Sequence, residues 1–233
     1  MTRRYFHPEL PLGGGLIQLD NGEAQHAARV MRVSIGDTII LFDGIGNEAE
    51  AKVSSVNRRQ VCCQCGPATE LDRESSISLS LGIALPKPDR AKEMVERLTE
   101  LGVASVTPII GDRTQRPPST SLIEKLRRSV IESCKQCGRN RLMVVHDPGS
   151  LAEFLSGGLF SSNRWIAHPS GAAPVSPRKD LNESVVALIG PEGGWSEEEV
   201  AQAISHGFQS VSLGKRILRI ETAAAVIAAL VMD

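Results

Sequence analysis

The chain has 233 residues, 41% of them hydrophobic, enough to bury the core of one large or two modest domains. Its 26 lysines and arginines nearly balance its 27 aspartates and glutamates, so any contact with nucleic acid requires a local basic patch. There is no apolar run of membrane-spanning length and no apolar stretch typical of a signal peptide near residue 1, and the five cysteines are typical of a reducing compartment. These features predict a cytoplasmic protein that does not enter a membrane.

The first part of the chain, residues 1 to about 70, is expected to form a small β-domain. Glycine-rich turns separate short apolar segments, and the turn at residues 43–47 lies between two segments of strand character. The predicted strands cover residues 38–42, 48–53 and 60–65.

One helix is predicted within this β-domain, over residues 23–32, because alanines and a methionine recur there at helical spacing. His26, Arg29 and Arg32 follow one another at intervals of three and would share roughly one side of that helix. Two interpretations remain open. The arginines solvate an exposed face with His26 packed beneath it, or the three residues contact RNA phosphates.

A polar stretch at residues 66–76 is the expected boundary between a domain at 1–70 and a domain at 75–233. Beyond it, strands and helices alternate, which predicts a mostly parallel sheet with helices on both faces. Three prolines between residues 168 and 184 exclude a long helix there. The predicted strands are 77–85, 103–110, 141–145, 165–167, 185–189 and 209–214, and the predicted helices are 89–101, 121–137 (opened by Ser121 and Glu124), 150–155, one following Ser196, and 222–230.

Two loops in the last third of the chain form the candidate ligand site. An apolar strand at 185–189 runs into the glycine-rich loop GPEGG, which leads to a helix whose start is marked by a capping box of Ser196 and Glu199. A second strand ends at Leu213 and Gly214, before a loop and an alanine-rich helix. Open α/β sheets bind their ligands at such carboxyl-end loops.

The residue types in these loops exclude some kinds of ligand site but do not identify the ligand. The glycine loop matches neither a P-loop nor a dinucleotide-binding motif, so a purely structural role stays open. In the second loop, Arg216, Arg219 and Glu221 flank apolar Ile217 and Leu218. Such a loop can hold an adenine against apolar backbone and present a cation to a substrate.

The cysteines raise the question of a zinc site, because Cys62 and Cys65, and again Cys134 and Cys137, are separated by two residues. Residues three apart in a strand point to opposite faces, and small thiols in a helix are usually buried, so no metal is expected. His168 ends a strand and is interpreted as a structural residue or as part of the wall of the site.

Two motifs in the right order, LIGPEGGWSEEEV and SLGKRILRIETA, resemble those of the ribosomal RNA small subunit methyltransferase E family, within the SPOUT (trefoil-knot) methyltransferases. The segments HAARVMR, LPKPDRAKEMVERLTELGV and ESCKQCGRNR extend the resemblance over essentially the whole chain. The chain departs from the family pattern at Cys134 and Cys137, where small residues are usual, and at Trp195, where Phe or Leu is commoner.

The resemblance implies an α/β fold with an N-terminal PUA-like, RNA-binding β-barrel and a C-terminal SPOUT methyltransferase domain containing a trefoil knot. It also implies a homodimer that uses S-adenosyl-L-methionine to methylate N3 of a uridine in 16S rRNA, uridine 1498 in the family, with the small ribosomal subunit as partner. The alternatives are a SPOUT methyltransferase acting on tRNA or large-subunit rRNA, and a non-catalytic RNA-binding ribosome assembly factor.

On this basis, residue roles are expected as follows. Arg219 stabilises negative charge on the base, and Glu192 or Glu221 orients that arginine or relays the proton of N3. The cofactor is held by Leu188, Ile189, Gly190, Pro191, Glu192, Gly193, Gly194, His168, Leu213, Gly214, Ile217, Leu218 and Thr222. RNA is contacted by His26, Arg29, Arg32, Arg113, Arg116, Arg128, Arg139 and Arg141.

Overall fold

A computed structural model of the chain describes residues 3–19, 21–57, 60–158, 163–172 and 184–232. The chain divides into two compact units, one of Met1–Glu74 with Ile131–Leu142 and one of Ser75–Val130 with Met143–Asp233. Two consecutive domains would not include residues 131–142 in the first unit. That segment is placed there by ion pairs with acids distant in sequence, described below.

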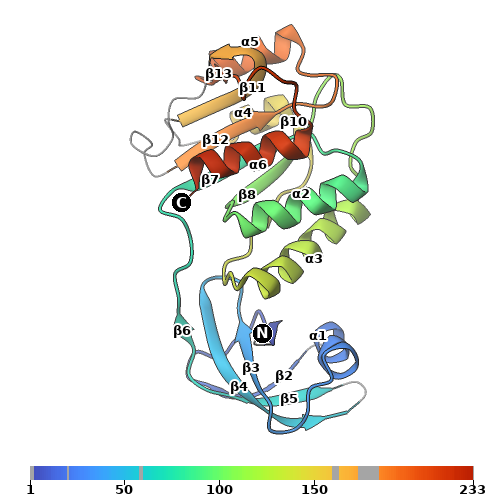
Figure 1. Ribbon diagram of the computed structural model, residues 1–233, viewed down its shortest axis with the longest axis vertical. Helices are drawn as coiled ribbons and strands as arrows, with labels where there is room; N and C mark the ends of the chain where they lie inside the picture. Colours follow the sequence, from blue (N-terminus) through green and yellow to red (C-terminus); the bar gives the residue numbers. More distant parts are fainter. Residues whose placement is uncertain (1–2, 20, 58–59, 159–162, 173–183, 233) are drawn as a thin grey trace. The chain divides into compact units, whose positions relative to one another are not determined.

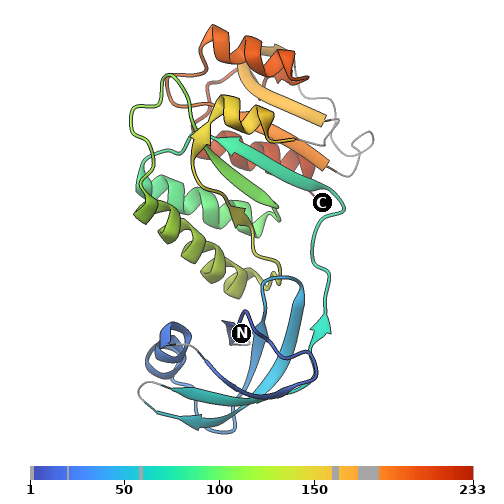
Figure 2. The ribbon, with the colours of Figure 1, turned by 180° about the vertical axis from the view of Figure 1, so that it is seen from behind.

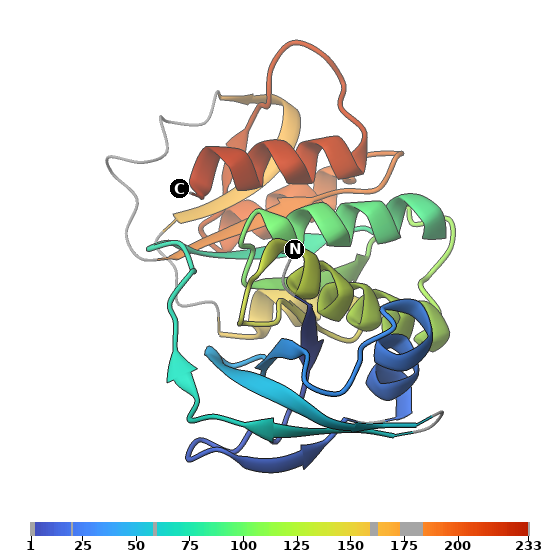
Figure 3. The ribbon, with the colours of Figure 1, turned by 60° about the horizontal axis from the view of Figure 1, so that its bottom comes forward.

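The first unit is built on a six-stranded sheet in the order β1-β3-β4-β5-β2, with β6 paired to β4. Strand β1 runs parallel to β3, and the other pairs are antiparallel. Figure 3 shows β4 and β5 as long, twisted neighbours. One face is apolar because alternate residues of each strand point inward, as Ala49, Ala51 and Val53 do in β4. The strands are β1 (Arg4–Phe6), β2 (Gly15–Gln18), β3 (Thr38–Phe42), β4 (Asn47–Val56), β5 (Val61–Cys65) and β6 (Thr69–Glu70).

The helical segment of this unit differs from the single helix predicted over residues 23–32. It consists of a short α-helix, α1 (Asn21–Gln25), followed by a π-helix, η1 (His26–Val30). Arg32 lies beyond both, with a left-handed backbone at φ 49°. The wider π turn and the reversal at Arg32 remove the 3.6-residue spacing, so the prediction of one shared α-helical face was wrong.

A buried ammonium group fixes this helical segment. Lys135, near the end of helix α3 (Thr120–Cys137), places Nζ 3.0 Å from Glu23 Oε1, 3.1 Å from His26 Nδ1 and 3.0 Å from Glu132 Oε1. Because an ammonium can only donate, His26 Nδ1 accepts. Burial and the neighbouring Lys135 charge lower the pKa of His26, so its ring stays neutral at physiological pH.

The second unit contains a seven-stranded sheet in the order β10-β8-β7-β12-β11-β13, with β9 paired to β8, and every pair is parallel. Helices α2 and α6 cover one face and α4 and α5 the other (Figures 1 and 2), which confirms the predicted layers. The strands are β7 (Ser78–Ile83), β8 (Ser105–Ile110), β9 (Val144–Val145), β10 (Gly149–Ser150), β11 (Asn163–Ala172), β12 (Ser184–Ile189) and β13 (Gln209–Val211).

The helices of this unit bury apolar stripes against the sheet. In α2, Ala91, Met94, Val95 and Leu98 are buried, and the helix is followed by Gly102 at φ 86°. None of the described helices is both long and apolar enough to span a bilayer. Besides α3, the helices are α2 (Pro88–Glu100), α4 (Leu151–Ser156), α5 (Glu197–Ser205) and α6 (Ile220–Val231).

Several predicted element boundaries differ from the structure. The strand expected at 165–167 runs from Asn163 to Ala172 as β11, so His168 lies within it and does not end it. The strand expected at 141–145 is reduced to β9, because the backbone of Arg141 bridges to Gly44 and Ile45 instead. Helix α3 begins at Thr120, and the hydroxyl of Ser119, not that of Ser121, accepts from the Leu122 amide. Of the proline-rich stretch at 168–184, residues 173–183 lie outside the described residues.

The buried ion cluster gives the first prediction. Replacing Lys135 by Met should lower the free energy of unfolding by about 3 kcal/mol, because the buried carboxylate of Glu23 would lose its ammonium partner. Denaturation followed by hydrogen exchange at the amides of α1 measures this loss. The matched control is Lys92→Met, since Lys92 is exposed and pairs with Glu96 at 3.6 Å on the surface of α2. Equal effects of the two substitutions would contradict the assignment.

Candidate active site

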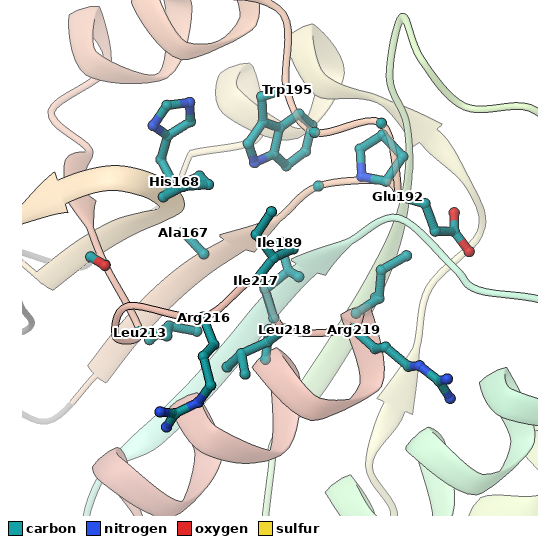
Figure 4. Close-up of a pocket in the computed structure, with 18 of the residues that line it drawn as sticks. Ala167, His168, Ile189, Glu192, Trp195, Leu213, Arg216, Ile217, Leu218 and Arg219 are labelled. Carbon is teal, nitrogen blue, oxygen red and sulfur yellow. The ribbon is translucent and has the colours of Figure 1, made fainter.

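A pocket of about 600 Å³ lies at the carboxyl ends of β11, β12 and β13. Its wall includes residues 167–169 of β11 and the two loops that follow β12 and β13, so the two loops singled out in the sequence do meet at one sheet edge. His168 and Trp195 lie on one side of the pocket, and Leu218 and Arg219 lie on the other (Figure 4).

The glycine loop packs directly on an indole ring. A Cβ atom at Gly190 would lie 3.0 Å from the ring of Trp195, closer than side chains normally approach. Trp195 is only 4% exposed and lines the pocket, and its Nε1 has no hydrogen-bond partner among the described residues. The indole therefore supports the glycine loop by direct packing.

The loop that follows β8 holds the glycine loop from the other side. Arg113 Nη1 donates to the carbonyl oxygens of Gly193 at 3.0 Å and Trp195 at 3.2 Å. Ser196 Oγ lies 2.8 Å from Asp112 Oδ2, and Glu199 Oε1 accepts from the Asp112 amide at 3.0 Å. These contacts connect the glycine loop to a second strand end and fix its shape.

The capping box predicted at the start of α5 is confirmed. Ser196 Oγ accepts from the Glu199 amide at 3.2 Å, and Glu199 Oε2 accepts from the Ser196 amide at 2.7 Å. Trp195 and Val200, on either side of this capping box, belong to one apolar cluster, which is the arrangement of a hydrophobic staple.

The second loop, residues 212–219, brings cations to the pocket. Ile217 is 91% exposed at its tip, and the side chains of Arg216 and Arg219 point away from each other (Figure 4). Arg219 is exposed and occupies the N-cap position of α6, and its side chain makes no hydrogen bond or ion pair with the part of the chain that the structure describes. Its guanidinium is therefore available to a ligand.

The two candidate acids are held by an arginine that sequence reasoning had not assigned to the site. Arg90, near the start of α2, places Nη2 3.3 Å from Glu192 Oε1 and Nη1 3.3 Å from Glu221 Oε1. Within the described residues neither acid forms a hydrogen bond or ion pair with the Arg219 side chain. The ion-pair partner of both acids is Arg90, which itself lines the pocket.

The remaining expected cofactor residues fall into two groups. Leu188 is fully buried in β12, and Thr222 and Glu221 lie on α6 without lining the pocket. The expected residues that do line it are His168, Ile189, Gly190, Pro191, Glu192, Gly193, Gly194, Leu213, Gly214, Ile217, Leu218 and Arg219. Lining residues that were not expected are Arg90, Ala167, Pro169, Trp195, Ser212, Lys215, Arg216, Ile220 and Ala223, with Arg113 expected only as an RNA contact.

The arginines expected to contact RNA differ in their exposure and in whether their guanidinium groups are already bound by the protein itself. Arg29, Arg32, Arg116 and Arg128 are exposed. Arg139 is only 6% exposed and its guanidinium is bound to Glu74, so it acts in the fold of the first unit. His26, held by Lys135, and Arg113, held by the glycine loop, are likewise occupied by the protein itself. Arg141 is partly exposed and lies 3.2 Å from Glu70.

The cysteines form no metal site in the described part of the chain, where no group of three or more suitable ligands comes together. All five are free thiols. Burial raises the pKa of Cys63 to about 11 and that of Cys134 to about 12, so these two groups remain protonated at neutral pH.

Comparison with known proteins identifies the class to which this fold and site belong. Residues 73–232 match the family model of the RNA methyltransferase domain, and residues 19–64 match that of the RNA methyltransferase PUA domain. The protein is therefore an RNA methyltransferase-type chain with a PUA-like N-terminal domain and a SPOUT, trefoil-knot α/β domain, the fold class expected from the resemblance.

Similarity to three relatives identifies the particular family of this chain. The chain is 32% identical over 217 residues to ribosomal RNA small subunit methyltransferase E of Synechocystis, covering 90% of this chain and 70% of that protein. It is 30% identical over 231 residues to the Aquifex aeolicus enzyme of that name, covering 94% and 95%. The Neisseria gonorrhoeae enzyme, crystallised with S-adenosyl methionine, is 30% identical with a TM-score of 0.91, covering 98% and 96%. The chain belongs to the ribosomal RNA small subunit methyltransferase E family.

The contact between Gly190 and Trp195 gives a prediction. Gly190→Ala should lower the free energy of unfolding by about 2 kcal/mol, because the added methyl group overpacks a buried ring. Urea denaturation followed by circular dichroism measures the effect. In a Trp195→Leu background the same change should cost less than about 0.5 kcal/mol, since the smaller side chain makes room. Equal costs in both backgrounds would mean that crowding by the indole is not the reason for glycine at this position.

Proposed function

We propose that this protein is an enzyme that transfers the methyl group of S-adenosyl-L-methionine to N3 of a uridine in the 16S rRNA of the small ribosomal subunit. The observation that carries the proposal is the pocket itself. Both loops that mark the family form its wall, and an uncommitted cation, Arg219, lies at its edge.

The residues of the pocket fit this cofactor. A volume of about 600 Å³ is in the range of small-molecule sites. Ile189, Leu218 and Ile220 provide apolar wall, the glycine loop allows close approach of backbone amides, and Trp195 also lines the pocket. When bound, S-adenosyl-L-methionine supplies an electrophilic methyl group on a sulfonium centre.

The chemistry required of the protein concerns the acceptor nitrogen. N3 of uridine carries a proton, and its loss leaves negative charge on N3 and on the two neighbouring carbonyl oxygens. A guanidinium already in place at that position stabilises the charge without reorganisation. Arg219 meets this requirement, and Glu192, whose side chain is 54% exposed at the pocket, is placed to take the proton.

RNA binding is assigned to exposed cations, because the chain carries no overall positive charge. Arg29 and Arg32 in the PUA-like domain and Arg116 and Arg128 in the methyltransferase domain are exposed, and Arg141 is partly so. We also propose a cytoplasmic homodimer. Partial exposure of Ala225, Val226 and Leu230 on the otherwise apolar α6 supports a partner surface there.

Two other functions compete with this proposal. A SPOUT methyltransferase of tRNA or large-subunit rRNA would use the same cofactor pocket, and an assembly factor without catalysis would share the fold. Membership of the family favours small-subunit rRNA, and an intact pocket with a free cation favours catalysis.

Transfer of labelled methyl groups tests the proposal. The wild type should label small subunits or naked 16S rRNA and leave tRNA unlabelled, and mapping should place the methyl group on uridine N3. Arg219→Ala should lower turnover at least about 100-fold, as loss of a charge-stabilising donor does, while calorimetry still detects cofactor binding. Label confined to tRNA would overturn the substrate, and unchanged turnover of the variant would overturn the role of Arg219.

The salt dependence of RNA binding tests Arg29. If its guanidinium contacts a phosphate, Arg29→Ala should weaken binding of 16S rRNA fragments and reduce the slope of log K against log salt by about one. Filter binding over a salt series measures both. Arg97→Ala is the matched control, because Arg97 is exposed and its side chain pairs with Glu93 at 3.5 Å on the surface. A slope that Arg29→Ala leaves unchanged would assign Arg29 to surface solvation.

A further inference from the structure

Arg90 pairs with both acids of the site, and the two carboxylates differ in their exposure. The side chain of Glu221 is 8% exposed, that of Arg90 30% and that of Glu192 54%, while both N–O distances are 3.3 Å. The second oxygen of Glu221, Oε2, has no partner among the described residues. Glu221 therefore depends on Arg90 for the neutralisation of a buried charge, whereas Glu192 does not.

This inequality determines which contact a ligand can replace. An ion pair with a buried carboxylate is costly to break from one side, because the carboxylate then stays unpaired. An exposed pair is weak and screened by water. Arg90 is thus anchored through Nη1 to Glu221 and can exchange its partner at Nη2, on the side of the pocket.

We propose that Arg90 is a second substrate-binding cation, whose Nη2 exchanges Glu192 for a carbonyl oxygen of the target uracil. The proposal rests on the proposed function and extends it. Uracil carries one carbonyl group on each side of N3, and the pocket presents Arg90 and Arg219 as separate cations. Each guanidinium then binds one of the two oxygens on which negative charge develops.

The exchange also provides a base at the moment when it is needed. While Glu192 is paired with Arg90, its Oε1 accepts a hydrogen bond from Nη2 and is not available to the N3 proton. Once a uracil oxygen replaces it, the N3–H bond breaks, the proton moves to a Glu192 oxygen, and the electron pair stays on N3 and the carbonyl oxygens. The total charge of the site is unchanged, because one anion has replaced another beside Arg90.

Substitution of Arg90 tests the proposal in single-turnover methylation of whichever RNA the wild type accepts. Arg90→Gln should lower the rate about 100-fold, with cofactor and RNA dissociation constants changed less than about threefold. The rising limb of the pH–rate profile should move to higher pH, because the uracil anion is less stabilised. Arg90→Lys should recover part of the rate, and Arg97→Gln, on the exposed side of the same helix, should leave it unchanged.

A purely structural role of Arg90 is tested by a double variant. Arg90→Gln leaves the Glu221 carboxylate unpaired and is expected to lower the melting temperature. Arg90→Gln combined with Glu221→Gln removes that charge and should restore stability, whereas the rate and the shifted pH profile should stay those of Arg90→Gln. If rate and stability recover together, Arg90 only braces the fold, and the proposal is overturned.

The result for the wild type distinguishes failure of this proposal from failure of the proposed function on which it rests. A wild type that methylates no RNA overturns the proposed function and the substrate role of Arg90 with it. An active wild type beside an equally active Arg90→Gln variant overturns the role of Arg90 alone.

Discussion

The pocket depends on how closely the glycine loop approaches Trp195. Only a residue without Cβ allows the backbone at Gly190 to lie on the indole, and this contact sets the height of the loop above the sheet. Arg113 then binds the carbonyl groups of Gly193 and Trp195 from the outside, so the loop is fixed on two sides. A loop held in this way presents its amides to a ligand without first losing conformational entropy.

Much of this arrangement follows from local sequence patterns. The apolar runs, the alternation of strands and helices, and the capping box of Ser196 and Glu199 each depend on residues close together in the chain, and the structure agrees with them. Parallel strands also bring their carboxyl ends to one edge, which is why two loops 20 or so residues apart in sequence could be expected to meet. The identity of the ligand came from the resemblance and not from these patterns.

What could not be predicted depends on single long-range contacts. The π-helix at His26–Val30 follows α1, which is tied by Glu23 to Lys135, over a separation of 112 residues that periodicity does not report. Assignment of residues 131–142 to the first unit has the same origin, since Arg139 binds Glu74. Arg90 was missed for a related reason. Its position in α2 indicates a solvated face, and only the tertiary fold places it between two acids.

The arginines of this protein therefore divide by the partners that the fold gives them and not by their place in a motif. Arg139 is buried against a carboxylate, and Arg113, although exposed, binds backbone carbonyl groups, so both guanidinium groups already have partners within the protein. Arg219 has no partner among the described residues, and Arg90 has one that is buried and one that is exposed. A guanidinium anchored at one end is better placed for transition-state stabilisation than a free one, because it keeps its orientation while one N–H remains exchangeable. Since Glu221 supplies that anchor from the first turn of α6, directly after Arg219, the same short segment positions both cations of the site.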